Sequence, residues 1–134
     1  MNYKGSIGRR GEALAAEYLE NSGFAVTERN FHVSHDEIDI IAENDKYIIF
    51  VEVKTRAQTA VNMRYGRPCM AVNYTKKQKM LRAVSEYLRR FKPEKCPRID
   101  VIEVYMPPVR EDSPIDAETL MPLKIKHITN VVHK

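Results

Sequence analysis

Charged side chains interrupt two segments of the chain that are otherwise apolar. Residues 36–39 read Asp-Glu-Ile-Asp, and residues 50–54 read Phe-Val-Glu-Val-Lys. Charged groups within apolar segments lower stability unless they are paired or bind a cation. The carboxylates of Asp39 and Glu52, with the backbone carbonyl of Val53, are oxygen ligands of the kind that Mg²⁺ and Mn²⁺ prefer. Such an ion can bind a phosphodiester oxygen and activate a water, so these residues suggest metal-dependent hydrolysis.

Strand geometry decides whether these charges can share one site. Side chains alternate between the two faces of a strand, so Glu52 and Lys54 lie on the same face. If residues 37–42 and 47–54 form an antiparallel hairpin whose turn leaves an even number of residues unpaired, Asp39 faces the same side. A shift of one residue would place Asp39 on the opposite face. We assume the even register, because it gathers the charges.

Two interpretations of this charged cluster stay open at the level of the sequence. In a metal site, Lys54 would orient the attacking water or stabilise the pentacoordinate phosphate, and Glu12 would add a carboxylate from the edge of the first helix. In a structural ion-pair network, Lys54 would instead neutralise Asp39 and Glu52. The spacing does not decide between them, because the tripeptide Glu-x-Lys occurs by chance in many chains.

The elements that must carry these residues follow from apolar periodicity and turn signals. The predicted order is helix, three strands, helix and strand, then a Pro-rich segment and a closing strand. The helices are predicted over residues 7–22 and 75–91, and the strands over residues 24–31, 37–42, 47–54, 98–105 and 124–132. Thr75 and Gln78 match a capping box, with Thr75 as the N-cap of the second helix. We therefore expect an α/β layer, in which two helices pack on a mixed sheet that contains the hairpin.

Two segments lack a clear period. Residues 56–74 contain Gly66 and Pro68 and are expected to form a loop. Residues 106–122 hold four prolines and four acidic residues and are expected to form a surface loop. At a length of 134 residues, the chain is expected to be one domain over residues 1–134.

The charge is unevenly distributed along the chain. The net charge is +4, but residues 54–98 hold 13 Lys and Arg against 2 Glu, a net charge of +11. This basic stretch indicates either a face that binds a polyanion or a solvated, lysine-rich helix.

The sequence shows no signal-peptide pattern, no apolar run long enough for a membrane span and no CxxC pair. A membrane protein, a disulfide framework and a zinc ribbon are therefore not expected, and we predict a cytoplasmic protein.

Basic residues close to the charged cluster are candidates for phosphate contact. They are Arg9, Arg10, Arg56, Lys76, Lys77 and Lys79. The first two begin the first helix, and the third follows the Glu-Val-Lys segment. The three lysines crowd the first turn of the second helix, where positive charge opposes the helix dipole but exposed backbone amides favour a phosphate. The alternative for each residue is a solvated side chain without a ligand.

The segments resemble, in the same order along the chain, the motifs of the YraN-like family, small bacterial proteins within the PD-(D/E)XK nuclease superfamily. The motifs are Gly8-x-x-Gly11-Glu12, Glu37-Ile38-Asp39, Phe50–Arg56, Ala71-Val72 with Lys76, Arg98–Val101 and Ile125–Asn130. They cover nearly the whole chain, and the ordered set is far more specific than any one motif. Two positions depart from the family pattern: Asp36 stands where glycine is usual, and Lys77 stands where glutamine is common.

The resemblance implies a restriction-endonuclease-like fold, similar to that of archaeal Holliday junction resolvases, with the order αβββαβ plus a C-terminal strand. It also implies hydrolysis of phosphodiester bonds with Mg²⁺ or Mn²⁺. By this resemblance Asp39 and Glu52 are metal ligands, Lys54 is the catalytic lysine, and Glu12 assists metal or water binding.

Three classes of function are compared on this basis. The first is a metal-dependent endonuclease, with DNA favoured over RNA and with junctions or flaps among its candidate substrates; a homodimer would let two sites address two symmetric strands. The second is a nucleic-acid-binding module that has the nuclease fold but does not cleave in isolation. The complete set of Glu12, Asp39, Glu52 and Lys54 argues against the second class. The third, an interaction protein, would leave the charge of residues 54–98 unexplained.

Overall fold

The computed structural model of the chain describes residues 3–57, 74–107 and 120–131. Its elements are α1 (Tyr3–Asn21), β1 (Ala25–Val33), β2 (Asp36–Glu43), β3 (Tyr47–Ala57), α3 (Tyr74–Phe91), β4 (Cys96–Met106) and β5 (Lys124–Ile128). This is the predicted order of helices and strands. In the part of the chain that the structure describes, neither helix has the length and hydrophobicity needed to cross a membrane.

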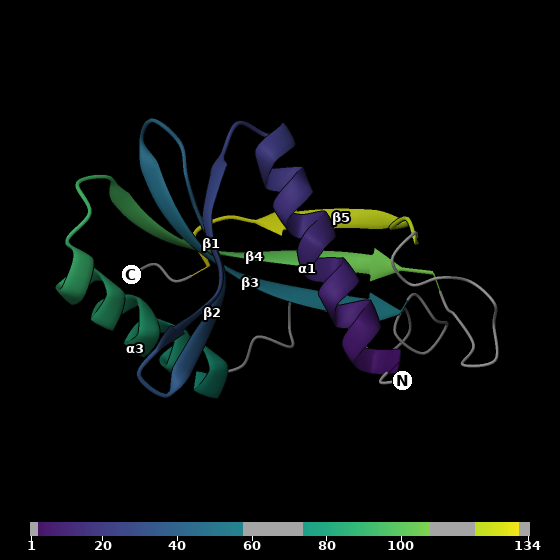
Figure 1. The fold of residues 1–134 in the computed structure, drawn as a ribbon, viewed down its shortest axis with the longest axis horizontal. Helices are drawn as coiled ribbons and strands as arrows, with labels where there is room; N and C mark the ends of the chain where they lie inside the picture. Colours follow the sequence, from purple (N-terminus) through teal and green to yellow (C-terminus); the bar gives the residue numbers. More distant parts are fainter. Residues whose placement is uncertain (1–2, 58–73, 108–119, 132–134) are drawn as a thin grey trace.

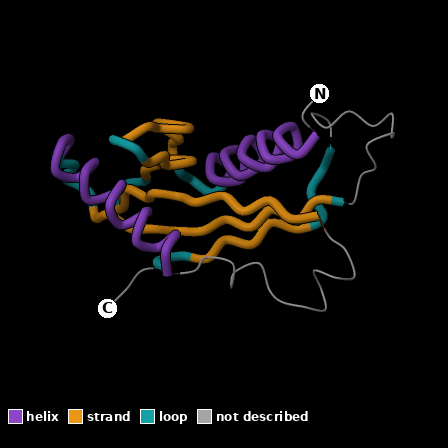
Figure 2. Tube along the Cα trace, turned by 90° about the horizontal axis from the view of Figure 1, so that it is seen from below, coloured by secondary structure: helices purple, strands orange, loops and turns teal. Residues whose placement is uncertain are grey.

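The strands form a five-stranded mixed sheet in the order β1-β2-β3-β4-β5. β3 and β4 pair in parallel, whereas the other neighbours pair antiparallel. A parallel pair needs a crossover connection, and α3 lies in that crossover. α1 packs on one face of the sheet and α3 on the other (Figure 1 and Figure 2). The predicted α/β class is therefore confirmed, and the arrangement is consistent with a restriction-endonuclease-like fold.

The alternation of side chains divides the apolar residues of β3 between two cores. Ile49 and Val51 belong to the core under α1, which includes Leu19. Ile48 and Phe50 belong to the core under α3. A strand that is buried on both faces reads as a continuous apolar run, and this explains why the charges at the end of that run are conspicuous in the sequence.

Two glycines shape α1 and its approach to the sheet. Gly23 has a φ of +94°, in the left-handed region that glycine tolerates, and the N–H of Phe24 donates to the carbonyl of Leu19 at 3.0 Å. The helix therefore ends where the sequence predicts. Gly11 faces β3 so closely that a Cβ there would overlap the hydroxyl of Thr55. The absence of a side chain at Gly11 lets this turn of α1 lie against β3.

The central strand is longer than predicted. The pairing of β3 with β4 continues to the pair Ala57–Met106, so β3 extends three residues beyond Lys54. Arg56 therefore lies in a strand, and its prediction as a loop residue is wrong. The extension depends on a partner strand that is distant in the sequence, and local periodicity does not report such a partner. α1 also begins earlier than predicted, at Tyr3.

Two predicted element ends are wrong as well. α3 begins at Tyr74, so Thr75 lies inside the first turn and not at the N-cap position. β5 ends at Ile128, because Asn130 has a φ of +53° and turns the backbone out of the strand. Residues 58–73 and 108–119 lie outside the described residues, so the two predicted loops stay predictions there.

A buried carboxylate, Asp100, joins β4, β5 and α1. It accepts two hydrogen bonds from Arg98 at 2.9 and 2.8 Å, one from Nε2 of His127 at 2.7 Å and one from the N–H of Asn130 at 2.9 Å. The other ring nitrogen of His127 lies 3.1 Å from the hydroxyl of Tyr18 on α1. Burial raises the pKa of Asp100, but the hydrogen bonds from His127, Arg98 and Asn130 outweigh burial and hold the pKa below 3.8.

Asp100→Asn should lower the free energy of unfolding by about 3 kcal/mol, because it leaves the half-buried Arg98 without its counter-charge. Since the pKa of Asp100 lies below 3.8 in the folded state, its contribution is complete above that pH and is lost as the pH falls further. Urea unfolding at neutral pH measures the loss. The control Glu86→Gln removes exposed ion pairs with Arg89 and Arg90 and should cost much less. Equal losses in the two variants would contradict this role of Asp100.

Candidate active site

The hairpin of β2 and β3 has the register that gathers the charges. Residues 40–43 of β2 pair in order with residues 51–48 of β3, so the turn leaves an even number of residues unpaired. The even register is therefore confirmed, and continuing it by one residue sets Asp39 opposite Glu52. Oδ2 of Asp39 accepts a hydrogen bond from the backbone N–H of Val53 at 2.9 Å. This bond fastens the Asp39 carboxylate to the strand that carries Glu52 and Lys54.

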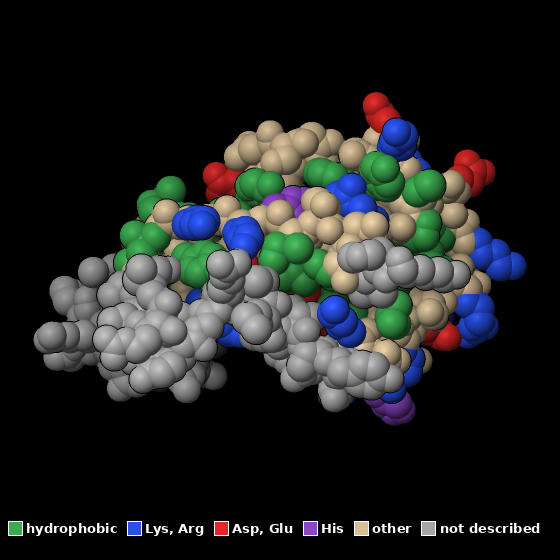
Figure 3. All heavy atoms as spheres, turned by 180° about the vertical axis from the view of Figure 1, so that it is seen from behind, with side chains coloured by type: hydrophobic (Ala, Val, Ile, Leu, Met, Phe, Trp, Pro, Cys, Tyr) green, Lys and Arg blue, Asp and Glu red, His purple; other side chains and the backbone are tan. Residues whose placement is uncertain are grey.

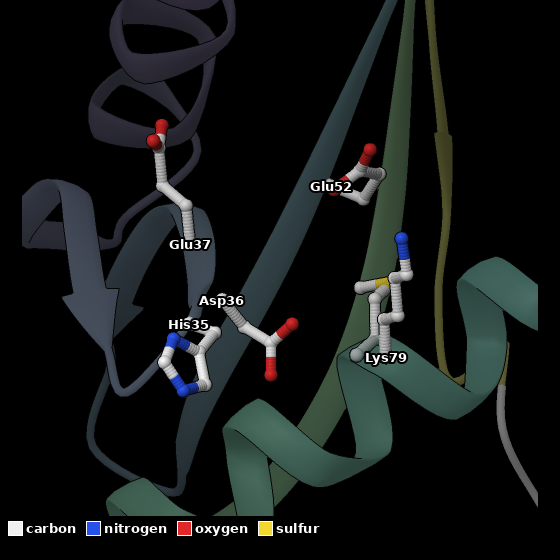
Figure 4. Close-up of a pocket in the computed structure, with 6 residues that line it drawn as sticks. His35, Asp36, Glu37, Glu52 and Lys79 are labelled. Atoms are coloured by element: carbon white, nitrogen blue, oxygen red, sulfur yellow. The ribbon is translucent and has the colours of Figure 1, made fainter.

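β2 leaves β3 at this point and stays paired with β1. Its pairing with β1 extends to Asp36, whereas its pairing with β3 covers residues 40–43. A pocket of about 310 Å³ lies at the separation, lined by His35, Asp36, Glu37, Glu52, Lys79 and Met80. Lys79 extends from α3 toward Glu52, and Glu37 points toward α1 (Figure 4).

Four carboxylates influence one another around this separation. The pKa of Asp39 is raised to about 7, first by burial and then by Glu52, with smaller effects of Glu12 and Glu37, against the hydrogen bond from Val53. Burial and the charge of Glu37 also raise the pKa of Glu12. A divalent cation would offset this repulsion, because it favours the ionised form of every nearby carboxylate.

Lys54 is buried beside Glu52. Its ammonium nitrogen lies 3.0 Å from Oε1 of Glu52, and the side chain of Lys54 is 8% exposed. Within the described residues no ion pair joins Lys54 to Asp39. A structural network in which Lys54 neutralises both Asp39 and Glu52 was the second interpretation of the sequence. Among the described residues, the ion pair to Glu52 is present and the one to Asp39 is not.

A buried glutamate on β4 is a residue that the sequence analysis did not identify. Glu103 pairs in register with Lys54 and is fully buried. Oε1 accepts a hydrogen bond from the hydroxyl of Tyr105 at 3.4 Å, and Oε2 has no hydrogen-bond partner among the described residues. Burial raises the pKa of Glu103. The signal that could have found it is the one that marked Glu52, a carboxylate inside an apolar strand.

Glu12 reaches this region from α1, because Gly11 lets the helix approach β3. Oε2 of Glu12 lies 3.1 Å from the side-chain nitrogen of Asn30, and the same nitrogen lies 2.9 Å from Oε1 of Glu37. The amide is assigned with its nitrogen toward both carboxylates, since a carboxylate accepts hydrogen bonds and does not donate them. Asn30 had no predicted role, because an asparagine in a polar strand carries no signal in the sequence.

The donor set fits a hard divalent cation that keeps part of its water. Asp39, Glu52 and the carbonyl of Val53 supply oxygen, and Mg²⁺ commonly binds through one or two carboxylates with several waters. Among the described residues, no group of three or more His, Cys, Asp or Glu is arranged to hold an ion. Water or substrate oxygens would therefore have to complete the coordination, and Glu12 as a further ligand stays a prediction.

Two of the residues predicted to contact phosphate lie on elements that carry the site. Lys79 lines the pocket. Arg56 lies on β3 two residues beyond Lys54, so it shares the strand face of Lys54. Phosphate contact by these two residues stays a prediction.

Three other residues predicted to contact phosphate, Arg9, Arg10 and Lys77, are not among the described residues that line the pocket. Arg10 donates from Nε to the carbonyl of Leu120 at 2.8 Å, which ties α1 to the segment before β5. Arg9 is exposed on α1, and Lys77 is half-buried on α3. The side chain of Lys76 lies outside the described residues.

Asp36, which stands where the family usually has glycine, is paired. Its two oxygens each accept a hydrogen bond from Arg82 on α3, both at 2.9 Å. These hydrogen bonds from Arg82 hold the pKa of Asp36 below its usual range. Arg82 therefore neutralises the added charge and ties the tip of the β1–β2 hairpin to α3.

Asp39→Asn should stabilise the metal-free fold while removing a candidate ligand. The variant keeps an acceptor for the N–H of Val53 and removes a buried charge beside Glu52. Because the pKa of Asp39 is raised from 3.8 to about 7, its ionisation destabilises the fold increasingly as the pH rises through that window. We expect a gain in unfolding free energy on the order of 2 kcal/mol at about pH 8, and little gain near about pH 4.

Urea unfolding in EDTA at the two pH values measures this gain. Glu17→Gln, an exposed change on α1, is the control and should show no pH-dependent gain. A gain in Asp39→Asn that is equal at both pH values would show that the buried charge is not its cause.

Comparison with known proteins agrees with the motifs. The model of the uncharacterised protein family UPF0102 matches residues 11–104. A UPF0102 protein of Caldanaerobacter subterraneus subsp. tengcongensis is 40% identical over 129 residues, which cover 95% of this chain and 94% of the relative. A UPF0102 protein of Thermodesulfovibrio yellowstonii is 39% identical over 98 residues, which cover 73% of this chain and 84% of the relative. A UPF0102 protein of Chlorobium chlorochromatii is 43% identical over 99 residues, which cover 73% of this chain and 73% of the relative. The resemblance is thus confirmed, and the chain belongs to the UPF0102 family, the YraN-like group.

Proposed function

We propose that this protein is a divalent-metal-dependent endonuclease that hydrolyses phosphodiester bonds of DNA. One observation carries the proposal: where β2 leaves β3, Oδ2 of Asp39 accepts a hydrogen bond from the N–H of Val53, between Glu52 and Lys54, and the Lys54 ammonium lies 3.0 Å from Glu52. This is the arrangement of acidic residues and lysine that the resemblance to PD-(D/E)XK nucleases implies.

The role of each side chain follows from its position. Asp39, Glu52 and the carbonyl of Val53 would hold Mg²⁺ or Mn²⁺, which stabilises charge on a phosphoryl oxygen and lowers the pKa of a bound water. Lys54 stabilises the negative charge that develops on the phosphate, because its ammonium is already held at Glu52 and needs little reorientation.

A nucleic acid is the proposed substrate because its phosphates complement the cations at the pocket, and the resemblance to junction resolvases favours DNA. Lys79 reaches toward Glu52 from α3, and Arg56 continues the strand face of Lys54 (Figure 4). Seen from behind, Lys and Arg side chains are spread over the visible described surface and do not gather in one patch (Figure 3). Contacts of Lys79 and Arg56 with phosphates would position a nucleic acid without reading its sequence. The resemblance to junction resolvases makes flaps and four-way junctions the first substrates to test.

A nucleic-acid-binding protein without cleavage activity is the second candidate. The ion pair of Lys54 with Glu52 favours it, because an ammonium that neutralises Glu52 takes over the charge balance that a cation would provide. In that case DNA binding would be unaffected by EDTA or Mn²⁺, and no cleavage would accompany it.

Cleavage of a labelled panel of duplex, single strand, flap and four-way junction tests the first proposal. We expect cleavage with Mg²⁺ or Mn²⁺ and none with EDTA. Glu52→Gln and Lys54→Ala should each lose at least about 100-fold in rate, because each removes a group placed at the reacting phosphate. The control Glu17→Gln should cleave like wild type. Cleavage that survives in both site variants would point to a contaminant, and binding without cleavage by wild type would favour the second candidate.

Salt dependence tests the phosphate contact of Lys79. Binding of duplex DNA to the Glu52→Gln variant should weaken as salt rises, and Lys79→Ala in that background should reduce the log–log slope by about 0.9. The control Lys46→Ala changes an exposed lysine in the β2–β3 turn, away from the pocket. If Lys79→Ala and Lys46→Ala give the same slope as their parent, Lys79 makes no phosphate contact.

A further inference from the structure

We propose that Asn30 is a positioning residue, whose side-chain amide joins the carboxylates of Glu12 and Glu37 and thereby couples α1 to the β1–β2 hairpin at the site. The observation is that one terminal atom of the Asn30 amide, assigned as the nitrogen because both neighbours are acceptors, lies 3.1 Å from Oε2 of Glu12 and 2.9 Å from Oε1 of Glu37. The consequence for metal binding rests on the proposed function, whereas the two hydrogen bonds do not.

The register places Asn30 in line with the candidate ligands. On β1, Arg29 pairs with Ile40 and Phe31 pairs with Ile38, so Asn30 lies level with Asp39. Continuing the register of β2 and β3 by one residue beyond the pair Ile40–Val51 brings Asp39 level with Glu52. The row that runs from Asn30 through Asp39 to Glu52 crosses three neighbouring strands at the point where β2 separates from β3.

The backbone explains why asparagine suits this position. Asn30 has a φ of +51°, in the left-handed region that asparagine and glycine adopt more readily than other residues. Glycine has no side chain, whereas the asparagine amide can donate two hydrogen bonds. A neutral amide donates to both carboxylates without adding a charge, and an aspartate of the same shape would add a negative one.

The amide holds together two groups that repel each other. The charge of Glu37 is the largest effect after burial on the pKa of Glu12, which it raises, and the hydrogen bond from Asn30 acts in the opposite direction. Hydrogen bonds to ionised acceptors are stronger than neutral ones. Without the amide, Glu12 and Glu37 would lose the hydrogen-bond donor that they share, and the attraction of Glu12 to Arg29 on β1, which lowers the pKa of Glu12 more than this hydrogen bond does, would remain.

The direct test is the side-chain NH₂ signal of Asn30 in proton–nitrogen NMR spectra of the full chain without metal. We expect both protons to be shifted downfield, with one shift lost in Glu12→Ala and the other in Glu37→Ala. Asn30 shifts that do not respond to either substitution would overturn the proposal. This measurement needs no metal and no nuclease activity, so it is independent of the proposed function.

The functional test is Mn²⁺ binding by electron paramagnetic resonance or calorimetry. Asn30→Gly keeps the left-handed backbone conformation and removes the amide. We expect about tenfold weaker Mn²⁺ binding in Asn30→Gly, as for other residues that orient metal ligands. The control Glu28→Gln lies exposed on the same strand and should bind Mn²⁺ like wild type.

The outcomes separate the two proposals. Weaker Mn²⁺ binding in Asn30→Gly with an unchanged thermal unfolding temperature supports the positioning role. Unchanged Mn²⁺ binding in that variant would overturn the positioning role, even if both hydrogen bonds exist. A wild type that binds no Mn²⁺ but shows both shifted Asn30 protons would support the coupling of α1 to the hairpin and would overturn the proposed metal-dependent activity.

Discussion

The candidate site depends on one constraint: Asp39 must stay fastened to β3 while its own strand turns away from β3. The hydrogen bond from the N–H of Val53 to Asp39 meets this constraint at 2.9 Å. It keeps the carboxylate next to Glu52 although β2 continues along β1, and the pocket lies at the resulting separation. The other features serve the same geometry, since α3 supports the bent hairpin through Arg82 and α1 approaches through Gly11.

Two aspartates in the same sheet show how their surroundings separate a structural carboxylate from a candidate functional one. Asp100 has four hydrogen-bond donors around it, and they hold its pKa below its usual range in spite of burial. Asp39 has the Val53 N–H and three neighbouring carboxylates, and its pKa is raised to about 7. A partly buried carboxylate whose pKa is raised because few donors or positive charges surround it is typical of a site that binds a cation or a substrate.

Much of this arrangement could be predicted from local sequence. The apolar runs of β2 and β3 predict the hairpin, but β3 is buried on both faces, so the apolar pattern does not select the register that aligns Asp39 with Glu52. The order of elements follows likewise from periodicity. The strand position of Arg56 could not be predicted, because it depends on parallel pairing with Tyr105 of β4, which lies 49 positions further along the chain.

The sequence by itself determined which residues can do chemistry and that Glu52 and Lys54 share one strand face, because the alternation of side chains along a strand is a local property, whereas the register that adds Asp39 to them was an assumption. The tertiary structure alone decided which distant groups meet them. Asn30 bridges Glu12 and Glu37 because Gly11 lets α1 lie against β3, and Arg10 turns to Leu120 and not to the pocket because the chain returns beside α1 before β5. These contacts join residues far apart in the chain, and they depend on how the helices pack on the sheet, which no local pattern encodes.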